Sequence, residues 1–83
     1  MSLTPGFAPD AKSQWQALDF EIQEIVLDEI ERVASNPPPD GEYVLDPVRE
    51  VAGVRLYVFV RVIVDRGRGT VTVVGVGTIA RKK

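Results

Sequence analysis

Apolar and polar positions alternate most clearly between residues 54 and 64. Every even position in this segment is apolar and favours β-structure, while the odd positions carry arginine, tyrosine, phenylalanine, arginine and isoleucine. A period of two residues is typical of a strand with one buried face. The glycine-rich segment 65–69 predicts a hairpin loop, and the β-branched segment 70–76 predicts the returning strand. Together they predict an antiparallel hairpin with an aliphatic face.

A second periodicity, of 3.6 residues, begins at Phe20. Its apolar side chains recur three and four positions apart as far as Val33, and most positions between them are acidic. This pattern is typical of an amphipathic helix. Three consecutive prolines at 37–39 must end the helix by Asn36, because proline cannot continue it and restricts the residue before it.

A shorter helical segment precedes the long one. Ala11, Trp15 and Leu18 lie at helical spacing, and Asp10 is expected to cap the first turn. The periodicity breaks at Asp19, which reads as the cap of the next helix. We therefore predict two helices, about 9–17 and 20–35, joined by a very short turn; a single kinked helix is the alternative.

The remaining segments carry weaker signals. Residues 42–46 read as a short strand that Pro47 confines to an edge or an end, and residues 48–52 are ambiguous. Burying both apolar stripes is simplest if the helices pack on the valine face. The prediction is a single α+β domain over 1–83, with a helical hairpin on one face of an antiparallel sheet of three to four strands. Residues 1–7 and 80–83 are expected to be flexible.

The other face of the long strand carries the most informative side chains. Arg55, Tyr57, Phe59 and Arg61 alternate with the valines and should point away from the helices, unless a β-bulge swaps part of the assignment. Guanidinium groups pair with phosphate or carboxylate, and aromatic rings stack on bases or grip apolar partners. The alternative reading is structural: the aromatic rings complete the core or a dimer interface, and the arginines are solvated.

Composition removes several classes of chemistry. The chain has no cysteine and no histidine, which excludes disulfides, thiolate nucleophiles, cysteine-based metal sites and the commonest general base. Acid–base work would fall to carboxylates, tyrosine, lysine or arginine. The glycine pairs at 67/69 and 75/77 lack the residues of phosphate-binding loops. We expect no metal site and no cofactor.

Charge is distributed unevenly along the chain. Residues 1–40 contain eight acidic and two basic side chains, whereas residues 41–83 contain four acidic and eight basic ones. This predicts a polarised surface, although an acidic helix face can also serve solubility alone. Arg61 interrupts the longest apolar stretch, so no membrane span is expected. With no secretory signal at the start, the chain is expected in the cytoplasm.

The order of these parts resembles the RelE/ParE superfamily of bacterial toxin–antitoxin toxins. The resemblance lies in four segments: residues 11–18, Ile22 to Pro38, Val54 to Asp65, and Gly69 to Gly77 with its Val-Gly-Val-Gly ending. It implies a compact toxin fold that an antitoxin protein wraps and inactivates. It also implies action either on translating mRNA at the ribosome or on DNA gyrase.

The resemblance also implies which residues would act. Arg61, within Arg-Val-Ile-Val, matches the arginine of the family's Tyr-Arg-Val motif, with Arg55 and Tyr57 as further candidates for catalysis. The RNA or partner surface would add Phe59, Arg66, Arg68 and Arg81.

The sequence departs from the ribonuclease pattern at two places. Val60 occupies the position of the motif's tyrosine, and Gly77-Thr78-Ile79 stands where many members have Gly-His-Arg. Three hypotheses follow: a toxin or toxin-like module bound by an antitoxin, a ribosome-dependent mRNA endoribonuclease, or a non-catalytic binding or oligomerisation domain of the same fold. Whether the chain is an enzyme, and whether it forms a homodimer, stay open at this level.

Overall fold

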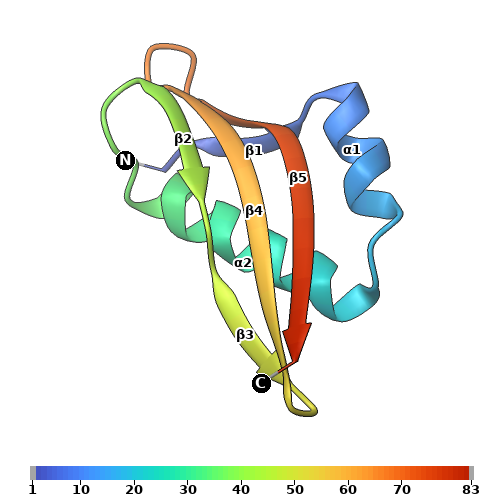
Figure 1. Ribbon diagram of the computed structural model, residues 1–83. Helices are drawn as coiled ribbons and strands as arrows, with labels where there is room; N and C mark the ends of the chain where they lie inside the picture. The colour runs from blue at the N-terminus through green and yellow to red at the C-terminus, as the bar shows by residue number, and fades with distance from the viewer. Residues whose placement is uncertain (1, 83) are drawn as a thin grey trace.

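The computed structural model describes residues 2–82, except for the side chains of residues 51 and 80–82. Two helices and a five-stranded mixed sheet form one α+β unit (Figure 1). The elements in chain order are β1 (Thr4–Phe7), α1 (Pro9–Gln16), α2 (Phe20–Ser35), β2 (Gly41–Leu45), β3 (Val48–Val51), β4 (Val54–Asp65) and β5 (Thr70–Lys82). The α+β prediction is confirmed.

The sheet is mixed, which corrects the prediction of an antiparallel sheet of three to four strands. Its order is β1-β5-β4-β2, with β3 also paired to β4. The additional strand is β1, which pairs in parallel with β5, while the other pairs are antiparallel. Residues 4–7 were expected to be flexible. Residues 5 and 6 are proline and glycine, which are disfavoured in strands, so residue propensities do not predict a strand here.

Contacts made by its neighbours hold β1 in place. The N–H of Leu3 donates to the carbonyl of Ala34 at 2.8 Å, and the Leu3 side chain is buried. The N–H of Ala8 donates to the carbonyl of Val73 at 2.8 Å, immediately before α1 begins. The N-terminal segment is therefore fixed at the end of α2 and along β5.

The two helices have nearly the predicted bounds. Asp19 is the N-cap residue of α2, although its side chain makes no capping hydrogen bond. The cap assigned to Asp10 is wrong: Ala8 is the N-cap of α1, and Pro9 follows as the first helical residue. Proline suits that position because its missing N–H would be unpaired there anyway. Asp10 instead lies in the first turn, where its charge favours the positive helix end.

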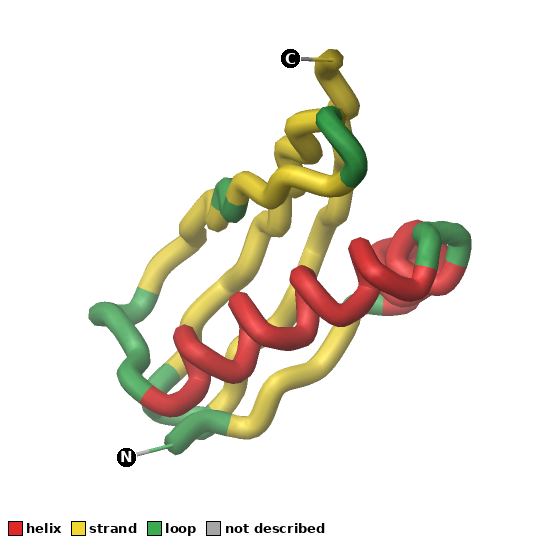
Figure 2. Tube along the Cα trace, turned by 90° about the horizontal axis from the view of Figure 1, so that it is seen from below, coloured by secondary structure: helices red, strands yellow, loops and turns green. Residues whose placement is uncertain are grey.

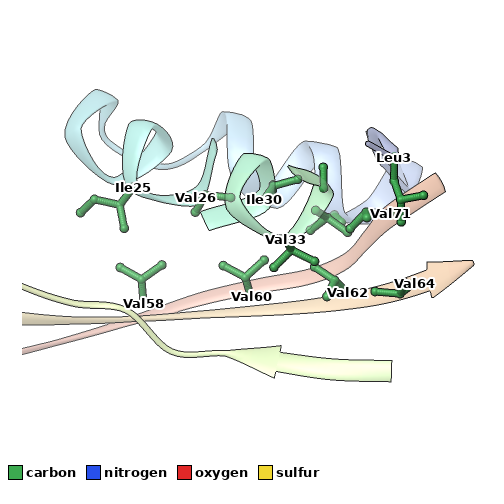
Figure 3. Packing of buried hydrophobic residues seen from close by; sticks show 13 residues of the cluster. Leu3, Ile25, Val26, Ile30, Val33, Val58, Val60, Val62, Val64 and Val71 are labelled. Atoms are coloured by element: carbon green, nitrogen blue, oxygen red, sulfur yellow. The ribbon is translucent and has the colours of Figure 1, made fainter. Parts of the chain in front are cut away.

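The valine face of β4 and the apolar stripe of α2 form the core, as the sequence predicts. Figure 3 shows the valines at 58, 60 and 62 pointing toward α2, and all three are fully buried. Ile30 is the best buried isoleucine of α2, at 1% exposure. Each such side chain contributes roughly 1.5–3 kcal/mol through its removal from water. This contact fixes which face of the sheet remains open.

A β-bulge interrupts the long β4–β5 ladder. Arg61 pairs with Gly75, but its neighbour Val62 pairs with Val73, so Val74 has no partner on β4. Near this point β1 ends, so it no longer supplies hydrogen-bond partners to β5. Beyond it, Gln14 of α1 provides an acceptor for a backbone N–H of β5. The Gln14 Oε1 atom accepts a hydrogen bond from the Val76 N–H at 3.0 Å.

The helices cover one side of the sheet only, as Figure 2 shows for α2. The molecule is elongated, with principal extents of 42 × 23 × 17 Å. The ends of β3, β4 and β5 project beyond α2 (Figure 1). Within the described residues, no helix combines the length and the apolarity needed to cross a membrane.

Candidate functional site

The sheet surface opposite the helices, here called the outer face, collects the candidate residues. Cross-strand partners point to the same side of a sheet, so the register of β4 assigns its members. They are Glu42 and Val44 of β2, Val48 and Glu50 of β3, Arg55, Tyr57, Phe59, Arg61 and Ile63 of β4, and Thr72, Gly75, Gly77 and Ile79 of β5. The predicted alternation along β4 is confirmed, because its valines at 58, 60, 62 and 64 are buried under the helices.

Arg61 forms an ion pair on this face with Glu42 of the adjacent strand. Its Nε atom lies 3.1 Å from the Glu42 Oε1 atom, and its Nη2 atom contacts the same oxygen. Both side chains are about half exposed. An exposed pair of this kind contributes about 0–1 kcal/mol to stability, so its main effect is to orient the Arg61 guanidinium across β2.

Arg55 lies in a second polar group at the other end of the face. Its Nη2 atom is 3.5 Å from the Glu50 Oε1 atom. A hydrogen bond with Tyr57 is the largest cause that raises the pKa of Arg55 above its usual value, and Glu50 adds to the rise. A raised pKa stabilises the folded state below the ordinary arginine pKa and loses that effect only at higher pH. The pair therefore adds no pH dependence near neutrality.

The three candidate catalytic residues lie on the same face of the sheet but are not all close to one another. Tyr57 is two positions from Arg55 on the same strand, so these side chains are neighbours. Arg61 is four positions beyond Tyr57, which at about 3.4 Å per residue separates their Cα atoms by roughly 13 Å. Arg55 and Tyr57 form one polar group, and Arg61 with Glu42 forms another.

Between and beside the two ion pairs, the outer face is apolar. Four large aliphatic side chains on it are unusually exposed: Val44 at 60%, Val48 at 44%, Ile63 at 42% and Ile79 at 46%. Val48, Tyr57 and Ile79 stand side by side across three strands. Phe59 lies in the next row of β4. We call this set, Val44, Val48, Tyr57, Phe59, Ile63 and Ile79, the apolar strip.

Two glycines of β5 lower the surface beside the apolar strip. Gly75 pairs with Arg61, and Gly77 pairs with Phe59. A Cβ atom at Gly77 would meet no atom within 4 Å, so this position is open. A Cβ atom at Gly75 would lie 3.7 Å from the Cδ atom of Arg61. Gly77 therefore leaves open space at the position paired with Phe59, whereas the Arg61 side chain lies close to Gly75.

Of the other predicted surface residues, the two loop arginines lie away from this set, whereas the backbone of Arg81 pairs with Arg55 of the outer face. Arg66 and Arg68 belong to the loop between β4 and β5 and are exposed. Arg68 lies 3.7 Å from the carboxylate of Asp65, and the backbone N–H of Arg66 donates to Asp40 at 2.7 Å. Arg81 follows Ile79 on β5, but its side chain lies outside the described residues. The loop arginines therefore do not extend the apolar strip.

Sequence reasoning missed half of this surface. Glu42 and Glu50 were not recognised as partners of the arginines, nor Val44 and Val48 as neighbours of Tyr57. One signal was available: an edge strand pairing antiparallel with the long strand would bring glutamates opposite arginines. The exposure of Ile79 depends on the length of β5, which the sequence placed only to residue 76.

The described residues offer no cluster of three or more acidic, histidine or cysteine side chains that could hold a metal ion. Nucleophile and base pairs of the kinds used in covalent catalysis are likewise not assembled on the outer face. Among the described side chains, the outer face offers two guanidinium–carboxylate pairs, one phenol and an apolar surface.

The arrangement of two helices over one face of a mixed sheet is similar to that of solved RelE structures, so the chain has a RelE-like fold. A mutant of the E. coli toxin RelE in the free state aligns over 93% of this chain and 83% of its own, at 19% identity and a TM-score of 0.75. The isolated E. coli RelE toxin aligns over 99% and 89%, at 16% identity and a TM-score of 0.67.

An assembled relative shares the same arrangement. The archaeal RelE–RelB complex from Pyrococcus horikoshii OT3 aligns over 92% of this chain and 93% of its matched chain, at 13% identity and a TM-score of 0.61. No protein-family profile and no curated protein sequence matches the chain. At these identities the likeness establishes the fold, and the function has to be argued from the outer face.

Proposed function

We propose that this chain is the toxin, or a toxin-like component, of a bacterial toxin–antitoxin pair and is held inactive by an antitoxin protein. The support is the RelE-like fold, which extends over nearly the whole chain, together with a related fold that occurs in complex with RelB. On this proposal the chain acts in the cytoplasm through contacts with other proteins. Its target is either the translating ribosome or DNA gyrase.

The paired arginines are the observation that favours protein contacts over cleavage of RNA. Arg61 is hydrogen-bonded to Glu42, and Arg55 is ion-paired with Glu50. Affinity for a phosphate backbone grows with the number of cationic contacts, and these four charged groups sum to zero. An apolar strip with balanced charge matches a protein surface better than it matches a polyanion.

A non-catalytic binding or oligomerisation domain of the same fold is the second candidate. The absence of histidine and the separation of Arg61 from Tyr57 both favour it over the ribonuclease. It differs from the toxin in one measurable property, because it has no target whose loss stops growth.

Expression in bacteria without a partner tests the main proposal. Induction of the chain alone should slow growth, and co-expression of a short neighbouring reading frame that encodes a DNA-binding antitoxin should restore it. The amount of soluble protein has to be measured in the same cultures. Normal growth at high soluble expression would refute the toxin and leave the binding domain.

A single substitution tests the hypothesis that the chain is a ribosome-dependent ribonuclease. Arg61→Ala should abolish cleavage of translated mRNA if Arg61 contacts the scissile phosphate, whereas Lys12→Ala removes one exposed positive charge from α1 and should leave cleavage intact. Primer extension on a translated message measures both. Equal cleavage by wild type and Arg61→Ala would remove Arg61 from that role.

A further inference from the structure

We propose that the outer face is a self-association surface, on which a second copy of this chain docks sheet to sheet in a weak, reversible homodimer. This goes beyond the proposed function, because it concerns the chain without its antitoxin. The apolar strip is the starting observation. Four aliphatic side chains on one face are exposed by 42–60%, and a group of exposed apolar side chains on one face often marks an interaction site.

Charge selects the occupant. Among its described side chains, the outer face carries Arg55 and Arg61 against Glu42 and Glu50, and these charges balance when two copies meet. The other exposed apolar side chains, Phe20 and Leu27 of α2, lie among acidic residues that are themselves exposed. Two copies meeting through α2 would place like charges together. Of these two surfaces, only the outer face is electrostatically compatible with itself.

The shape of the face also fits a second sheet. Packed sheets lie about 10 Å apart, and their side chains interdigitate. Gly77 provides open space in which a side chain of the opposite copy can enter next to Phe59. A face that carried a β-branched residue at this position would be filled already, and a second sheet could not approach Phe59 from the side.

The size of the face indicates that the dimer is weak. Eight residue steps along β4 and three strands across span roughly 27 × 14 Å, or about 400 Å² per copy. Two copies would bury on the order of 800 Å² in total, below the roughly 1,200 Å² of stable specific interfaces. Association is therefore expected in the micromolar range and above, and an antitoxin with a larger interface would displace it.

The dimer would cover the candidate site. Arg55, Tyr57 and Arg61 all lie on the face that the second copy occupies. A copy paired with itself could not present these residues to RNA or to a protein target. Free, unneutralised chain would then be active in proportion to its monomer fraction, which falls as its concentration rises.

Sedimentation velocity on the purified chain, from about 1 to about 500 µM, tests the proposal. The wild type should shift from monomer toward dimer over this range. The double variant Val44→Thr/Val48→Thr keeps β-branched residues of similar volume while adding hydroxyl groups to the strip. Its dissociation constant should rise at least about tenfold.

Leu27→Gln is the matched control, because it removes a similarly exposed apolar side chain from α2 and should dimerise like the wild type. If Val44→Thr/Val48→Thr does not fold by circular dichroism, Ile63→Thr replaces it. A wild type that stays monomeric at every concentration overturns the proposal. Loss of association in Leu27→Gln, with none in the strip variants, overturns it as well. Neither result depends on whether the chain arrests growth.

Discussion

Ala52 has a backbone conformation that its side chain disfavours. Among the described residues it is the only non-glycine with a positive φ, at 51°, and Gly53 follows with a φ of 79°. These two residues form the turn between β3 and β4. Two-residue hairpin turns of type I′ need the left-handed region at both positions, which asparagine and glycine adopt more readily than alanine.

Replacing Ala52 should therefore raise stability. Ala52→Asn is expected to increase the free energy of unfolding by roughly 0.5–1 kcal/mol, because asparagine tolerates the left-handed region. Urea denaturation measures the change. Ala17→Asn is the control: Ala17 caps α1 with a φ of −80°, so asparagine brings no gain there. A destabilised Ala52→Asn protein would contradict the turn geometry.

Ile30 tests the core in the opposite direction. Its side chain is 1% exposed and faces the valines of β4 from α2. Leu27 on the same helix is 37% exposed. Ile30→Ala should cost about 2–5 kcal/mol, through lost burial and a cavity. Leu27→Ala should cost well under about 1 kcal/mol. Chemical denaturation of the two variants compares these costs, and similar losses would place α2 in a different rotation on the sheet.

At the level of elements, what the sequence could predict depended on the length of each pattern. The 12-residue β4 and the 16-residue α2 carry enough positions for their periods to show. β1 has only four residues, two of which are proline and glycine, and β3 has four residues directly after Pro47. Both short strands exist because a neighbouring strand offers unpaired hydrogen-bonding groups, which no local pattern records.

In the candidate site too, the residues of the long strand could be placed from the sequence, but their partners on the neighbouring strand could not. Alternation placed Arg55, Tyr57, Phe59 and Arg61 on one face correctly. It could not reveal that Glu42 lies beside Arg61, because the two are 19 positions apart in sequence. Their contact depends on the register between β2 and β4, and the roles of these residues in catalysis stay predictions.

The link between α1 and β5 can be tested at one side chain. The Gln14 Oε1 atom accepts the Val76 N–H, beyond the point where β1 ends. Gln14→Leu would remove this acceptor and should cost about 0.5–1.5 kcal/mol. Gln16→Leu, on the same helix, makes a comparable change without that bond. Thermal unfolding compares the two, and equal melting temperatures would show that the bond contributes nothing.

At the level of the whole molecule, α2 covers only part of the length of the sheet (Figure 1). The middle of β4 lies under α2, while its first residues project with β3 and the end of β5 (Figure 1). Val58 and Val60 are fully buried, but Val54 and Leu56 are only partly buried. The projecting part has fewer buried contacts to hold it closed.

Hydrogen exchange should record this difference. Amides of residues 58–64 are expected to exchange only through global unfolding, whereas amides of residues 54–57 should exchange faster through local opening. The measurement is native-state exchange by NMR at increasing urea. Uniform protection along β4 would mean that the projecting end is as stable as the part beneath α2.

The unpaired residue at position 74 decides which side chains each surface of β5 receives. Before it, Val71 and Val73 are buried in the core; after it, Val76 packs against the core, and Gly75 and Gly77 fall outward. Deleting Val74 would leave a regular ladder in which Arg61 still pairs with Gly75 and Val62 with Val73, so both glycines would still face outward. A regular ladder that kept Val74 would instead send both glycines inward. Homologues of this chain should therefore keep Gly75 and Gly77 on the outer face whether or not they retain the extra residue at position 74.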